Sequence, residues 1–118
     1  MDTRKKIVTV DEITGEGWVG IAGLFDPLTV EQAERIAALV SRVPDRKLLA
    51  VITPASGTLL SAEARAALVA GLREVRAVVI AEPDTVRARG IEINEDQEGE
   101  ARRSSEFVEF VLARQRSK

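Results

Sequence analysis

The chain has 118 residues, and its hydrophobic content of 45% comes almost entirely from aliphatic side chains, since aromatic residues make up only 3%. Lysine and arginine total 17 against 19 aspartates and glutamates, so the formal net charge of -2 gives no reason to expect binding to nucleic acid or to an anionic membrane. With no cysteine and no histidine, disulfides, thiolate chemistry and histidine bases are excluded, and any reaction must use carboxylates, hydroxyls, lysine or arginine.

The length fits a single domain spanning residues 1–118, with no internal repeat and no linker long enough to divide it. No apolar run approaches the roughly 20 residues needed to cross a bilayer. The opening residues Met1–Lys6 also lack the hydrophobic segment of a signal peptide. We therefore expect a cytoplasmic protein.

The first half of the chain alternates between strand-like and helix-like patterns. Ile7–Val10 is a short β-branched run that suits an edge strand, and Trp18–Ala22 suits a core strand. From Val30, apolar residues recur at helical spacing, which predicts an amphipathic helix that ends before Pro44 and buries Val30, Ala33, Ile36, Ala37 and Val40.

A second strand-helix-strand unit follows. Leu48–Ile52 is a continuous apolar run typical of a parallel strand covered on both faces, and Pro54–Gly57 ends it. Ser61 is a plausible N-cap for a helix whose apolar stripe is Ala64, Leu68, Leu72 and Val75. Ala77–Ile80 follows as another buried strand.

The last third is less regular. Residues 82–85 predict a short turn of helix that Gly90 ends, and Ile91–Ile93 alternates like a brief strand. A polar loop is expected over residues 94–103, followed by a helix over about 104–115 that starts at Ser104 or Ser105 and directs Phe107, Phe110 and Val111 inward.

Strands joined by helices predict right-handed crossovers, and hence an α/β fold: a three-layer α/β/α sandwich with a Rossmann-like, mostly parallel sheet. In such sheets ligands bind in the crevice at the carboxyl ends of the strands. Gly23–Leu28 falls at one such end, directly before the first long helix.

The segment Gly23-Leu24-Phe25-Asp26 before a helix resembles the opening of the cytidylyltransferase-like nucleotidyltransferases, which include glycerol-phosphate cytidylyltransferases and the nucleotidyltransferase half of ADP-heptose synthases. The resemblance extends in order over most of the chain: to the lead-in Lys6–Glu12, the second strand Leu48–Val51, the segment from Leu60 to Ile80, and the serine motif Arg103–Ser105.

The resemblance implies a vacated reactive centre. The family's His-x-Gly-His motif stabilises the triphosphate during nucleotidyl transfer, and its two histidine positions match Thr29 and Gln32, with Glu31 at the glycine. Thr29–Gln32 instead has the form of a helix capping box. The family's basic residues after the second strand are replaced by Pro54–Thr58, and the interval from Asp84 to Ile91 is too short for the family's next helix and strand.

A nucleotide, CTP or ATP, could still bind through what remains. The candidate nucleotide-binding residues are backbone amides near a helix N-terminus, two serines at the last helix and one arginine: Gly23, Phe25, Asp26, Arg65, Ser104 and Ser105. The structural alternatives are a tight turn, N-capping serines and an arginine on a solvated helix face. Asp26 is a single carboxylate, so no metal site is predicted, and Mg²⁺ enters only with a nucleoside triphosphate.

Two other patterns are interpreted as coincidental. Gly15–Gly20 matches the dinucleotide motif Gly-x-Gly-x-x-Gly, but its third glycine falls inside a strand instead of opening a helix. Asp11-Glu12 is reminiscent of the acidic pair of response-regulator receivers, but Ile52-Thr53-Pro54 offers no aspartate to accept a phosphoryl group.

The sequence therefore predicts a catalytically degenerate nucleotidyltransferase-like domain that acts as a nucleotide-binding or protein-interaction module. One alternative is an active enzyme with a divergent site, transferring a cytidylyl or adenylyl group to a phosphorylated sugar or polyol. Another is a purely structural homodimer, since family members often dimerise and a shortened sheet exposes strand edges that need cover. A homo-oligomer is expected.

Overall fold

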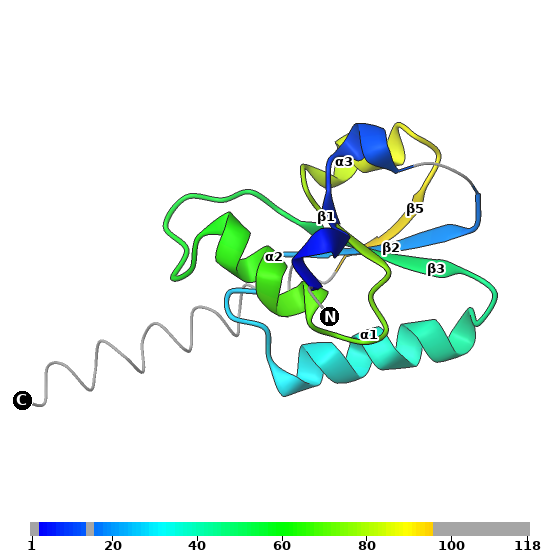
Figure 1. Ribbon diagram of the computed structural model, residues 1–118, viewed down its shortest axis with the longest axis horizontal. Coiled ribbons are helices and arrows are strands. Elements are labelled where there is room, and N and C mark those ends of the chain that lie inside the picture. Colours follow the sequence, from blue (N-terminus) through cyan, green and yellow to red (C-terminus); the bar gives the residue numbers. More distant parts are fainter. Residues whose placement is uncertain (1–2, 14–15, 96–118) are drawn as a thin grey trace, which may run out of the picture.

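A computed structural model describes residues 3–13 and 16–95 of the chain (Figure 1). It contains a five-stranded, all-parallel sheet with the order β1-β4-β3-β2-β5. The strands are β1 (Ile7–Val8), β2 (Trp18–Gly23), β3 (Lys47–Ile52), β4 (Ala77–Ile80) and β5 (Glu92–Glu95). The predicted Rossmann-like α/β architecture is confirmed.

The strand order explains where a ligand crevice can form. From β2 the chain steps outward to β3 and then β4, and it next crosses back to place β5 on the other side of β2. This is the 3-2-1-4 order of Rossmann sheets, in which the direction of winding reverses between the two central strands. The topological switch point of this sheet therefore lies between β2 and β5, where Ile21 pairs with Asn94.

Helices cover both faces of the sheet (Figure 1). On one face lie α1 (Val30–Arg42) and α2 (Ala62–Ala70), which connect β2 to β3 and β3 to β4. The other face carries the short α3 (Pro83–Arg87) and the 3₁₀ turn η2 (Val10–Glu12), while a second turn, η1 (Thr3–Lys6), precedes β1. Among the described residues no helix is long and apolar enough to cross a membrane.

Two hydrophobic cores result, one on each face. The α1/α2 core contains Ile21, Leu48, Ala50 and Ile52 from the strands with Ile36, Leu39 and Val69 from the helices. The opposite core contains Ala22, Leu49, Val51 and Val79 with Val86 of α3 and Ile13. Successive residues of β3 thus enter opposite cores, as expected for a parallel strand buried on both faces.

Most predicted elements are confirmed near their predicted ends. The first strand is shorter than expected, because Thr9 caps the turn η2, in which Glu12 accepts from both the amide and the hydroxyl of Thr9. The edge position of this strand, beside β4, is confirmed. Gly90, with φ of 83°, follows α3 as predicted. Asn94 and Glu95, predicted to open a loop, instead extend β5.

The predicted buried faces of the helices need correction. The prediction that α2 buries a face through Ala64 and Leu68 was wrong, because Leu68 is 49% exposed. The buried residues of α2 are Arg65, Ala66, Val69 and Ala70. The helix ends before Leu72 and Val75. In α1, Ile36 is buried as predicted, but Val30 is 75% exposed because it lies in the first turn, beyond the end of the strands.

Gly20 lies within β2, which confirms that the glycine pattern ending there does not open a helix. A Cβ atom at Gly20 would collide with Cδ1 of Ile93, its partner on β5. Gly20 therefore allows the side chain of Ile93 to cover the strand. The predicted helix over 104–115, with Phe107, Phe110 and Val111, and most of the polar loop lie outside the described residues.

Candidate functional site

The turn after β2 is the part of the chain that the family resemblance singles out. It follows Gly23 at the carboxyl end of the strand, as predicted. Phe25 has φ of 50°, an uncommon value for a residue with a bulky side chain, and its ring is buried in the α1/α2 core at 1% exposure. The Asp26-Pro27 peptide bond is cis. The burial of Phe25 shows that its ring is directed into the core and is not presented at the surface of the turn.

Asp26 holds the neighbouring loop. The side chain is 4% exposed, and its two oxygens accept hydrogen bonds from the backbone amides of Leu59 at 2.7 Å and Leu60 at 2.8 Å. These are charge-assisted hydrogen bonds, roughly twice as strong as neutral ones. The carboxylate thus ties the turn after β2 to the segment that leads into α2.

Arg65 connects the ends of two strands from beneath α2. It is 1% exposed, and its Nη1 atom donates to the carbonyls of Leu24 at 2.9 Å and Thr53 at 3.0 Å. The expectation of a solvated helix face for this residue was wrong, because its long side chain runs under the helix to the sheet. Arg65 Nε and Thr53 Oγ1 are buried without a hydrogen-bond partner among the described residues.

Thr29 and Gln32 form the predicted capping box at the start of α1. Thr29 Oγ1 accepts from the amide of Gln32 at 3.2 Å, and Gln32 Oε1 accepts from the amide of Thr29 at 3.0 Å. Gln32 is 2% exposed. The two positions that match the family's histidines are therefore engaged in the helix terminus.

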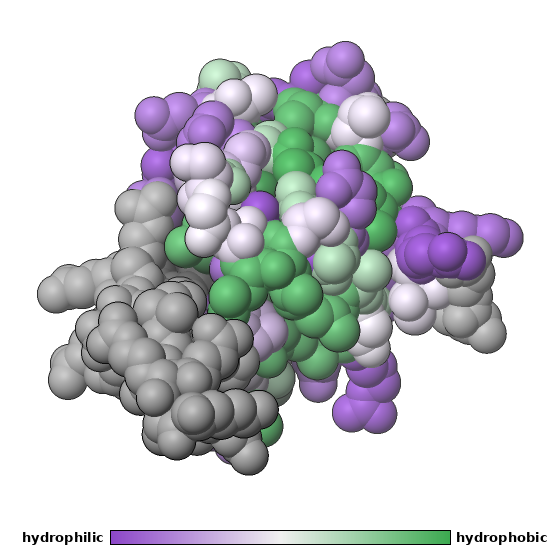
Figure 2. Space-filling view, turned by 90° about the vertical axis from the view of Figure 1, so that its left-hand side faces the viewer, coloured by the Kyte–Doolittle hydropathy of each residue, from purple (hydrophilic) through white to green (hydrophobic). Residues whose placement is uncertain are grey.

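The surface around this turn is apolar and acidic. The side chains of Val30 and Leu59 are 75% and 45% exposed. Three exposed acidic residues, Glu31, Glu63 and Glu82, follow the carboxyl ends of β2, β3 and β4 along the chain. Figure 2 looks onto this end of the molecule and shows apolar surface gathered there. Such a surface does not attract a triphosphate.

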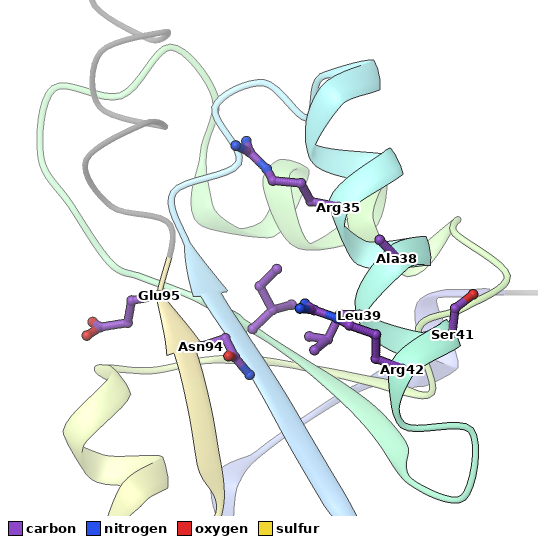
Figure 3. Close-up of a pocket in the computed structure, with 8 residues that line it drawn as sticks. Arg35, Ala38, Leu39, Ser41, Arg42, Asn94 and Glu95 are labelled. Atoms are coloured by element: carbon purple, nitrogen blue, oxygen red, sulfur yellow. The ribbon is translucent and has the colours of Figure 1, made fainter.

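A groove lies between α1 and the β2–β5 pair (Figure 3). Its volume is about 660 Å³, within the range of small-molecule sites. The α1–β5 groove, as we name it, is lined by Ile21, Arg35, Ala38, Leu39, Ser41, Arg42, Asn94 and Glu95. Ile21 and Leu39 supply apolar side chains to this lining. Figure 3 shows Arg42 directed from α1 toward β5, whereas Glu95 extends from β5 away from α1.

The β5 side of the groove is fixed by hydrogen bonds. Asn94 Nδ2 donates to the carbonyl of Gly20 at 3.3 Å. Arg87 of α3 donates to Glu95 at 2.8 Å and to Asp84 at 3.0 Å. These bonds, that to Glu95 first, raise the pKa of Arg87 above its ordinary value, so the guanidinium that holds Glu95 stays charged.

The structure brings Gly23, Phe25, Asp26 and Arg65 to one end of β2, where Asp26 and Arg65 bond to backbone groups of neighbouring loops, whereas Ser104 and Ser105 lie outside the described residues. Within residues 3–13 and 16–95 no three potential metal-ligating side chains gather. Sequence reasoning missed the α1–β5 groove, because Arg35 and Arg42 are typical of a solvated helix face and no motif links them to Asn94.

Comparison with protein-family models found no match to this chain, and a search of curated proteins found none either. The fold and the site define the class of protein: a Rossmann-like α/β domain with a groove at the switch point between β2 and β5.

Proposed function

We propose that this chain is a catalytically degenerate member of the cytidylyltransferase-like nucleotidyltransferases that acts as a nucleotide-binding module through the α1–β5 groove. The observation that carries the proposal is the structural use of the reactive positions. Thr29 and Gln32 are neutral side chains whose oxygens accept from each other's backbone amides, so neither can supply positive charge to a leaving pyrophosphate.

The chemistry of the groove supports a nucleotide ligand. The side chains of Ile21 and Leu39 offer an apolar surface to a base and ribose, and Arg42, with Arg35 further along α1, brings positive charge to the helix side of the groove. Asn94 adds amide donors and acceptors at the opposite wall. The groove runs beside β2 and β5, the two strands that form the switch point near which Rossmann-like sheets bind ligands.

A protein partner is the second candidate, and a separate observation favours it. Val30 and Leu59 are large apolar side chains exposed at the carboxyl end of the sheet. The outer edge of β5 has no strand partner among the described residues. Both features suit a second copy of this chain, giving the expected homo-oligomer.

Thermal unfolding with CTP and ATP, each with and without Mg²⁺, tests nucleotide binding. A ligand that binds only the folded state at one hundred times its Kd stabilises it by about 2.7 kcal/mol, which raises the Tm measurably. The variant Arg35→Gln/Arg42→Gln should lose that response, whereas Arg73→Gln/Arg76→Gln removes the same charge at two exposed positions outside the groove and should keep it. No response at millimolar nucleotide overturns the proposal.

Two measurements distinguish the proposed nucleotide-binding module from an active enzyme and from a protein-interaction module. Pyrophosphate release with CTP or ATP and a panel of sugar and polyol phosphates should be zero, and measurable turnover would establish the active enzyme instead. Light scattering gives the oligomeric state. A dimer that Val30→Ser/Leu59→Ser converts to monomers, together with no response to nucleotide, would favour the interaction module.

A further inference from the structure

A second pocket opens at the opposite end of the sheet, where the strands begin. Its volume is about 330 Å³, at the lower limit for small-molecule sites. The basic pocket, as we name it, is lined by five cationic side chains, one carboxylate and two aliphatic residues: Lys6, Arg46, Lys47, Arg73, Arg76, Glu74, Leu48 and Val75. In a chain of formal net charge -2, this is a marked local excess of positive charge.

The topology of the sheet gathers these cations from distant parts of the chain. Lys6 directly precedes β1, Arg76 directly precedes β4, and Lys47 begins β3. These three strands are neighbours in the sheet, so their amino ends lie side by side. The backbone amide of Arg76 donates to the carbonyl of Leu48 at 3.0 Å, which fixes the β4 side of the pocket against the β3 side.

Three of the five cations are held in place by the fold. Lys6 Nζ donates to the carbonyl of Leu72 at 3.1 Å. Lys47 Nζ lies 4.5 Å from the centre of the Trp18 ring, in a cation–π contact. Arg46 pairs with Glu92 at 3.0 Å. These contacts position positive charge around the pocket without requiring a ligand.

Arg73 and Arg76 differ from these three. Both side chains are exposed, and neither makes an ion pair or a side-chain hydrogen bond with any residue that the structure describes. Helix C-termini attract cations, and α2 ends close by at Ala70. That end carries roughly half a negative charge, and Lys6 already bonds to the carbonyl of Leu72 just beyond it. The helix dipole therefore explains the position of Lys6, but it does not explain why Arg73 and Arg76 also gather at this end of the sheet.

We propose that the basic pocket binds a small phosphate-bearing anion, with Arg73 and Arg76 as its principal ligands. Guanidinium groups donate paired hydrogen bonds that match phosphate oxygens. Lys6 and Lys47 add positive charge without having to move. The anion is either a free inorganic phosphate or the phosphate group of a metabolite. This proposal does not depend on nucleotide binding, because the basic pocket and the α1–β5 groove have no lining residue in common.

Amide NMR spectra of the full chain, titrated with inorganic pyrophosphate at constant ionic strength set by chloride, test the proposal. We expect the largest shifts at Lys47, Leu48 and residues 73–76. Arg73→Gln/Arg76→Gln should raise the Kd at least about tenfold, and Arg87→Gln/Arg89→Gln, with the same charge change on the α3 face, should leave it unchanged. Parallel titrations with inorganic phosphate and with glycerol 3-phosphate, which each carry a single phosphoryl group, distinguish the two sources: tighter binding of inorganic phosphate favours an inorganic ion, and tighter binding of the ester favours a metabolite.

The proposal is overturned if pyrophosphate causes no shifts up to about 10 mM, well beyond ordinary ligand affinities. It is also overturned if the two arginine-pair variants weaken binding equally, because the effect is then one of net charge. The groove variant Arg35→Gln/Arg42→Gln should retain the pyrophosphate response. Loss of the nucleotide response alone in that variant supports the function proposed for the groove, and so the two sites fail or succeed separately.

Discussion

Thr29 and Gln32 bond to each other's backbone across the first turn of α1, with N···O distances of 3.0 Å and 3.2 Å. Each side chain satisfies an amide that the helix itself leaves without a partner. Gln32 is also buried, at 2% exposure. A pair of positions at which the resembled family keeps reactive histidines thus stabilises the start of a helix in this chain.

Thr29→Ala should destabilise the protein by about 1 kcal/mol, because the Gln32 amide loses its acceptor. Urea unfolding followed by circular dichroism measures the change. Ser41→Ala, a hydroxyl removed from the last turn of the same helix, is the matched control and should change stability by less than about 0.5 kcal/mol. Equal effects of the two variants would contradict a capping role for Thr29.

Thr29→His/Gln32→His should not restore nucleotidyl transfer. Two imidazoles cannot reproduce the capping box, and the position of Gln32 is buried, so a histidine there must lose hydration to become charged. We expect no pyrophosphate release and a lower Tm. Turnover above that of the wild type would mean that the surrounding pocket is still catalytically competent.

Arg65→Met should be strongly destabilising, by about 3 kcal/mol, because it leaves the carbonyls of Leu24 and Thr53 without their buried donor. Arg65→Lys should lose less, since an ammonium can donate to both. The control Arg76→Met replaces an exposed arginine and should have an effect within about 0.5 kcal/mol. Chemical denaturation ranks the three variants, and a mild effect of Arg65→Met would show that the arginine is not a structural tie.

Gly20→Ala should destabilise the protein by no more than about 1 kcal/mol, since the new Cβ meets only Cδ1 of Ile93, the far end of a side chain that can rotate away at a small cost. Ile93→Val removes that atom. The double variant Gly20→Ala/Ile93→Val should therefore be more stable than the sum of the single effects predicts. Strict additivity in this double-mutant cycle would show that the two side chains do not compete for one space.

The sequence was sufficient to predict the elements that carry strong local signals. The strand over Leu48–Ile52 was predicted from a continuous apolar segment of strand length between turn residues. The helix starting at Val30 was predicted from its capping box and the helical spacing of its apolar residues. The parallel direction of the strands was predicted from the crossovers, but the order β1-β4-β3-β2-β5 was not, because right-handed crossovers do not determine which strands are neighbours.

The buried face of α2 was not predictable by the same reasoning. Alanines on every side of this helix weaken its hydrophobic pattern, and the aliphatic part of Arg65 takes a position that an apolar residue usually holds. The location of the turn at the end of β2 was predicted, but not the engagement of Asp26 and Arg65 in backbone hydrogen bonds. The α1–β5 groove depends on residues brought together only by the β2–β5 pairing.

The most direct test of the proposed function is an amide NMR titration of the full chain with CTP and with ATP in the presence of Mg²⁺. The account predicts saturable shifts at Ile21, Leu39 and Asn94, around the α1–β5 groove, and their loss in Arg35→Gln/Arg42→Gln. An absence of shifts at these residues at millimolar nucleotide, or shifts confined to residues 73–76 of the basic pocket, would contradict it.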